Sequence, residues 1–155
     1  MEPTLQTLDA ITLCGVARTF TGATRHQIPD LWMEAVPKIF ALEGRQGDTT
    51  YGACIGMNTK EGDDYGFVYM AAVEVGPTAA EVEGMTTVVA PAGRYAVYTF
   101  DDHISKFSEF VDAVWRDLFP TSGLTRRSAP DFERYDERWD PETGMGPVDY
   151  FIPVE

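Results

Sequence analysis

Residues 130–139 read Pro-Asp-Phe-Glu-Arg-Tyr-Asp-Glu-Arg-Trp, and residues 150–154 read Tyr-Phe-Ile-Pro-Val. Both stretches are rich in aromatic residues, and the connection between them, residues 140–147, holds two prolines and two glycines. This pattern predicts two strands joined by a turn-rich segment. Side chains alternate along a strand, so one face of the first strand should carry Glu133, Tyr135, Glu137 and Trp139.

Glu133 is the unusual member of this face, because it is an acid placed among aromatic rings. Desolvation of a carboxylate is unfavourable unless a partner supplies charge or hydrogen bonds. A flat organic cation would be such a partner, since rings can cover its faces while the acid pairs its charge. A solvated glutamate on an edge strand is the plain alternative. We expect Glu133 to bind a ligand, because aromatic neighbours share its face.

Residues 132–135, Phe-Glu-Arg-Tyr, followed by the strand at 150–154, resemble the end of a GyrI-like, AraC-type effector-binding domain. Further stretches agree with this family in the same order along the chain: residues 28–32, 51–54, 70–75 and 91–97. Such domains form the drug-sensing half of several bacterial multidrug regulators and also occur alone. The resemblance implies a ligand cleft between two halves of the domain, with Glu133 at its base pairing with cationic drugs.

Hydrophobic periodicity divides the chain into two similar halves. The first half predicts a strand at 10–20, a helix at 28–40, and strands at 50–57 and 65–75 joined by a polar loop, 58–64. The second predicts a strand at 94–100, a helix at 104–118, and strands at 132–139 and 148–154, with a short strand at 86–90 in the connection. The expected fold is a single α+β domain over 1–155, with pseudo-repeats of about 8–76 and 85–155, antiparallel sheets and both helices on one side. Pro37 must kink or divide the first helix.

Composition narrows the classes of function. The formal net charge is −13, from 25 acids against 12 bases, which argues against nucleic acid as a partner and fits attraction of cations or simple solubility. The apolar runs are too short for a membrane span. Cys14 and Cys54 form no disulfide framework, so a cytoplasmic location is expected. The repeats use nearly every residue, which favours a sensor without its own DNA-binding module.

Aromatic residues on the expected strands and helices are the candidates for a ligand wall around Glu133. They are Tyr135, Tyr150, Tyr51, Tyr69 and Trp115. Sheet packing is an equally good explanation for the tyrosines. Trp115 is the better candidate of the two helix tryptophans, and Trp32 is expected in the core. The histidines and cysteines show no zinc spacing, and no cofactor is expected.

The leading hypothesis is a small-molecule binding protein for cationic, aromatic or amphipathic compounds, without enzyme activity. A GyrI-like hydrolase is the alternative, in which a desolvated Glu133 beside Tyr135 acts as a general base and opens electrophilic rings. Inhibition of a protein target such as gyrase also occurs in the family, and the sequence offers no interface signature for it.

Overall fold

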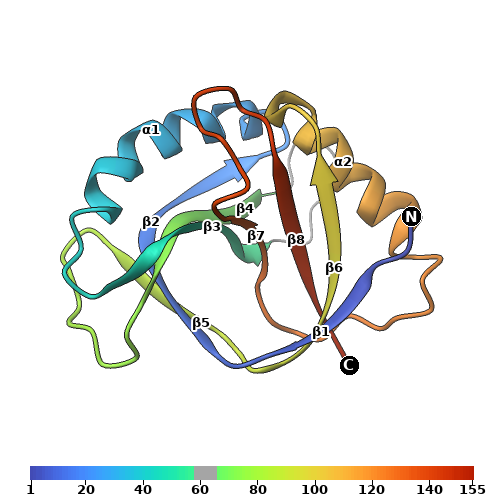
Figure 1. Ribbon diagram of the computed structural model, residues 1–155, viewed down its shortest axis with the longest axis horizontal. Helices are drawn as coiled ribbons and strands as arrows, with labels where there is room; N and C mark the ends of the chain where they lie inside the picture. The colour runs from blue at the N-terminus through green and yellow to red at the C-terminus, as the bar shows by residue number, and fades with distance from the viewer. Residues whose placement is uncertain (58–65) are drawn as a thin grey trace.

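The computed structural model describes residues 1–57 and 66–155 (Figure 1). Its centre is one eight-stranded antiparallel sheet with the strand order β1-β6-β8-β7-β3-β4-β2-β5. The strands are β1 (Thr4–Leu8), β2 (Ile11–Thr21), β3 (Arg45–Met57), β4 (Gly66–Val75), β5 (Thr86–Ala90), β6 (Gly93–Asp101), β7 (Asp131–Tyr135) and β8 (Pro147–Val154). The helices are α1 (Ile28–Ile39) and α2 (Phe107–Ala113), and α2 continues as a π-helical segment, Val114–Leu118.

The described strands and helices follow the predicted repeat. β2-α1-β3-β4 and β6-α2-β7-β8 are two strand–helix–strand–strand units, and the pairing of β3 with β7 joins them. Gly52 of β3 lies opposite Glu133 of β7 at this seam. The α+β prediction is therefore confirmed, with the refinement that the two units share a single sheet.

One face of the sheet carries both helices, and we call it the helix face. A row of register partners crosses it from β4 to β6: Ala71, Gly52, Glu133, Tyr150 and Tyr98. Leu31 and Ala35 of α1 pack at the Ala71 end of this row. Phe107 and Val114 pack at the Tyr98 end. The helices thus cover the face on which Glu133 lies, and this agrees with the prediction that both helices are on one side.

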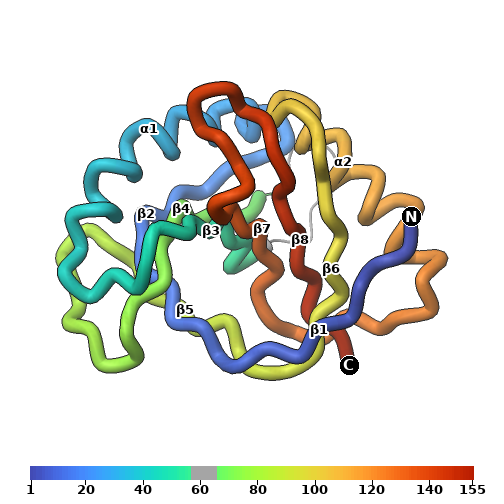
Figure 2. Tube along the Cα trace, viewed as in Figure 1, coloured from blue at the N-terminus to red at the C-terminus, as the bar shows by residue number. Residues whose placement is uncertain are grey.

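The opposite face forms the inside of a curl. Leu8 of β1 and Val88 of β5, from the two ends of the strand order, pack against the same buried cluster. Figure 2 shows the curl as a half barrel, with β1 and β5 along its lower side and both helices above. Phe132 and Phe151 stack within this inner cluster, with ring centroids 4.7 Å apart.

Both helices differ in detail from the prediction. α1 buries Leu31, Ala35 and Ile39 at a spacing of four residues, as an amphipathic helix should. Pro37 does not divide it, because it lies in the last turn, where its ring removes one amide hydrogen bond shortly before the helix ends at Ile39. The second helix changes to π geometry at Val114, where the Phe119 amide donates to the Val114 carbonyl. Trp115 lies in this wider turn.

Several strand boundaries also differ. β1 was not predicted, because its five residues are mostly exposed and show no clear alternation of apolar and polar side chains. β7 ends at Tyr135, because the chain turns at 136–139. The prediction that Glu137 shares the face of Glu133 is therefore wrong, since the side chain of Glu137 is exposed in that turn. The predicted loop at 58–64 and Tyr65 lie outside the described residues. Within the described ranges, no helix is long and apolar enough to cross a membrane.

Candidate functional site

Glu133 lies at the centre of a buried hydrogen-bond cluster on the helix face. Only 9% of its surface is exposed. The Tyr69 hydroxyl donates to its Oε1, and the Tyr135 hydroxyl donates to the same atom at 2.9 Å. Trp32 of α1 extends this series of hydrogen bonds, since its Nε1 donates to the Tyr69 hydroxyl at 2.9 Å. We refer to Trp32, Tyr69 and Glu133 as the Glu133 triad.

Gly52 makes this contact between strands possible. Tyr69 is on β4 and Glu133 is on β7, with β3 between them. Gly52 faces Glu133 in register, and a Cβ built on it would overlap the Tyr69 hydroxyl and Glu133 Oε1 and would lie 2.7 Å from Tyr69 Cζ. A glycine at this position therefore leaves the space in which the tyrosine and the acid meet across a strand.

A second acid lies two residues earlier on the same strand. Asp131 is 7% exposed and accepts a hydrogen bond of 2.5 Å from the Tyr150 hydroxyl. Trp115 Nε1 donates to that hydroxyl at 2.8 Å. Arg126 also reaches this acid, with Nη2 3.3 Å from Asp131 Oδ1. We refer to Trp115, Tyr150 and Asp131 as the Asp131 triad.

The two triads have matching geometry, and their tryptophans and tyrosines lie on corresponding elements of the two units. Each begins at a helical tryptophan, passes through a tyrosine on the last strand of its unit, and ends at an acid of β7. The tryptophan and tyrosine rings are 6.4 Å apart at 71° in one triad and 6.5 Å apart at 79° in the other. The triads differ in their surroundings, because Tyr135 bonds to Glu133 whereas Arg126 pairs with Asp131.

The electrostatics of Glu133 are dominated by loss of water. Burial raises the pKa of Glu133 to about 7, and the hydrogen bonds from Tyr69 and Tyr135 oppose this only in part. The nearby charge of Asp131 adds to the rise. Burial also raises the pKa of both tyrosines, so their hydroxyls stay protonated and act as donors to the acid.

Arg134 and Arg138, the cations that the sequence places closest to Glu133, are engaged elsewhere. Their Nη2 atoms lie 3.2 and 2.6 Å from Asp149 Oδ2, and Arg138 also binds Asp136. Within the described part of the chain, the ion pairs include no cation at Glu133, and none contributes to its pKa shift.

Five of the six predicted site residues lie on the helix face: Glu133, Tyr135, Tyr69, Tyr150 and Trp115. Tyr51 does not join them. Its ring is on the inner face, 5.9 Å from Phe132, because it alternates with Gly52 along β3. That these six residues contact a ligand remains a prediction.

Three members of the cluster were not predicted as site residues. Trp32 was expected only in the core, although its match to Trp115 in the repeat could have identified it. Asp131 shares the face of Glu133 by simple alternation, which is a signal that the sequence contained. The part played by Gly52 depends on the pairing of β4, β3 and β7, which alternation along one strand does not reveal.

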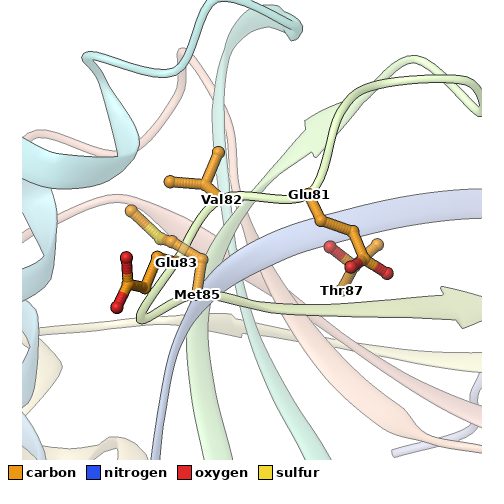
Figure 3. A pocket seen from close by; sticks show the side chains of 5 residues that line it. All are labelled: Glu81, Val82, Glu83, Met85 and Thr87. Atoms are coloured by element: carbon orange, nitrogen blue, oxygen red, sulfur yellow. The ribbon is translucent and has the colours of Figure 1, made fainter.

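Buried side chains fill the region where a ligand cleft was expected. Tyr69, Tyr135 and Tyr150 are each less than a tenth exposed, and half-buried Trp32 and Trp115 lie over them from the helices. A surface hollow of about 420 Å³ is found elsewhere, on the connection between β4 and β5 (Figure 3). Its lining contains no residue of either triad: Glu81, Val82, Glu83, Met85 and Thr87.

In the described ranges, no three His, Cys, Asp or Glu side chains are grouped to hold an ion. Cys14 and Cys54 are free thiols, and burial raises the pKa of Cys54 to about 12, so this thiol is not a ready nucleophile.

Comparison with known proteins places this fold in a family. The transcriptional regulator BrlR of Pseudomonas aeruginosa is 30% identical over 137 residues, which are 87% of this chain and 49% of that protein, so the chain spans about half of it. The structure of SAV2435 bound to tetraphenylphosphonium has a TM-score of 0.76 at 23% identity, covering 100% of this chain and 94% of that one. A hydrolase of Listeria innocua shares the fold with a TM-score of 0.52 at 12% identity, over 99% and 92% of the two chains. Residues 1–155 match the GyrI-like small molecule binding domain. The protein belongs to the GyrI-like family of small-molecule binding domains.

Proposed function

We propose that this small-molecule binding domain binds organic cations, with Glu133 pairing the positive charge. The observation that carries the proposal is a buried acid with a raised pKa and aromatic walls, for which the described residues supply no cation. Both tyrosine bonds go to Oε1, so Oε2 is the oxygen that a ligand would meet. Aromatic rings with an acid are the combination that recognises a cationic ring system.

A structure with the same fold suggests this class of ligand. The SAV2435 structure carries tetraphenylphosphonium, a permanent cation with phenyl rings. BrlR is a transcriptional regulator, and in such a protein a domain of this kind would serve as the effector sensor. We therefore propose a cytoplasmic ligand sensor or sequestering domain with broad specificity, because stacking and one charge pair define few directional contacts.

For a ligand to reach Glu133, the Trp32 side chain that covers this part of the helix face would have to move. Trp32 is half-buried above Tyr69 and Tyr135, with its ring 5.6 Å from the Tyr135 ring. Rotation of this indole would break one hydrogen bond, to the Tyr69 hydroxyl, and would uncover the acid. A bound aromatic cation would then replace the indole against the two tyrosines.

Calorimetry with tetraphenylphosphonium tests the proposal. Glu133→Gln should weaken binding by about 1–3 kcal/mol, because a charge-assisted contact is lost while the shape is kept. Binding of the neutral analogue triphenylphosphine oxide should change much less. Glu74→Gln is the matched control, since Glu74 is a half-buried acid on the opposite face of β4. Equal losses for the charged and neutral ligands would remove Glu133 from the site, and failure of the wild type to bind the cation would refute the proposal.

The same binding should depend on pH. A bound cation favours the ionised acid, so it lowers the pKa of Glu133 from about 7 and releases a proton where the free acid is protonated. Affinity should therefore rise with pH by up to about tenfold per unit below pH 7 and level off above it. Calorimetry in buffers of different ionisation enthalpy measures the released proton, which should be absent in Glu133→Gln.

Hydrolysis is the second candidate, and the pKa of Glu133 favours it. An acid with a pKa of about 7 suits a general base, and tyrosine hydroxyls lie beside it. The test is incubation with epoxide or cyclopropane electrophiles, with ring opening followed by mass spectrometry. We expect no turnover, because no nucleophile, metal or set of oxyanion donors is evident around Glu133 in the described residues. Turnover that is lost in Glu133→Gln would establish the hydrolase.

A further inference from the structure

We propose that the Asp131 triad is a second cation-binding site, which Arg126 fills from within the chain. The proposal rests on the function proposed above and extends it, because it assigns a ligand class to the second triad. It makes Arg126 the residue that restricts the protein to one bound positive charge.

The placement of Arg126 resembles that of a bound ligand. Its guanidinium carbon lies 5.8 Å from the centre of the Trp115 ring, and its Nη2 lies 3.3 Å from Asp131 Oδ1. A cation near an aromatic face with its charge paired to an acid is the arrangement expected for an organic cation. Nη2 also donates to the Ala129 carbonyl at 3.1 Å.

The exposure of the pair indicates a site that can open. The Arg126 side chain is 42% exposed, whereas the Asp131 side chain is 10% exposed. The acid is therefore fixed inside the fold by Tyr150, while the cation approaches it from solvent. Loss of Arg126 would leave the buried Asp131 carboxylate unpaired, which is destabilising, so a free cation that takes its place would restore a favourable ion pair.

The comparison of the triads gives the ligand class. The Glu133 triad likewise consists of a tryptophan, a tyrosine and an acid, and the described residues place no arginine beside it. Removal of Arg126 should leave both buried acids without a cation. Asp131 and Glu133 are two residues apart on one strand, about 7 Å along it. A bis-cation such as an aromatic bis-amidine could then pair one charge with each acid.

Guanidinium rescue tests the second site independently of the first. Arg126→Ala leaves the buried Asp131 without its cation. We therefore expect the variant protein to have a lower melting temperature than the wild type. Ethylguanidinium at millimolar concentration should restore the melting temperature, compared with sodium at equal ionic strength. The rescue should be absent in Arg126→Ala/Asp131→Asn and in the wild type. An equal response to ethylguanidinium in the double variant would overturn the proposal.

Ligand selectivity gives the second readout. We expect the ratio of affinities for an aromatic bis-amidine and the matching mono-amidine to rise by about tenfold in Arg126→Ala, because one charge-assisted contact is gained. Arg126→Lys, which keeps the charge, should leave the ratio near that of the wild type. An unchanged ratio in Arg126→Ala, with normal mono-amidine binding, would refute the Arg126 inference alone. A wild type that binds neither amidine, with ethylguanidinium rescue intact, would refute the function proposed for Glu133 alone.

Discussion

Lowering the pH from 8 to 5 should stabilise the wild type by about 2–3 kcal/mol more than it stabilises Glu133→Gln. The pKa of Glu133 rises from 4.5 to about 7 on folding, because the fold removes its water. Between these values the folded protein binds more protons than the unfolded chain, so stability falls as pH rises. The contribution is complete below pH 4.5 and is lost as the pH rises through 7.

Urea unfolding at pH 5, 6, 7 and 8 measures this difference. Asp131 also has a pKa raised by burial, but it is present in both proteins and largely cancels in the comparison. Glu74→Gln should keep the pH slope of the wild type. Parallel stability profiles for the wild type and Glu133→Gln would show that folding does not raise the pKa of Glu133.

Gly52→Ala should destabilise the protein by about 2–5 kcal/mol, the largest effect that we expect from adding one methyl group. The new Cβ would occupy the space of the Tyr69 hydroxyl and Glu133 Oε1. Overpacking costs about 1–3 kcal/mol, and a buried hydroxyl or carboxylate deprived of its partner costs a similar amount. The variant should also lose cation affinity, because the acid would be pushed out of its tyrosine contacts.

Gly56→Ala is the matched control for this prediction. Gly56 lies on the same strand, and among the described residues a Cβ there would meet only Val68 Cγ2, at 3.9 Å. We expect its free energy of unfolding to change by less than about 1 kcal/mol, as for ordinary substitutions away from special contacts. Similar destabilisation by the two alanines would mean that the strand, and not the Tyr69–Glu133 contact, is sensitive at Gly52.

The unit order of the fold could be read from the sequence because each element carries its own periodicity. Leu31, Ala35 and Ile39 recur at helical spacing, and the strands are marked by aromatic and branched residues between turn signals. Alternation along β7 also placed Tyr135 beside Glu133. It failed at Glu137, because whether the strand continues past Tyr135 depends on its neighbours in the sheet.

The sequence by itself therefore determined the repeated α+β units and the acidic character, and it made Glu133 a candidate site residue, because these follow from local composition and spacing. Only the tertiary structure decided which side chains meet. The seam of β3 and β7 brings Tyr69 to Glu133 across Gly52, although the two partners are 64 positions apart. The seam likewise puts Tyr51 on the other face. The segment before β7 brings Arg126 to Asp131. The physical reason is that strand order and register are fixed by burial over the whole sheet, and a shift of one residue would send every side chain to the opposite face.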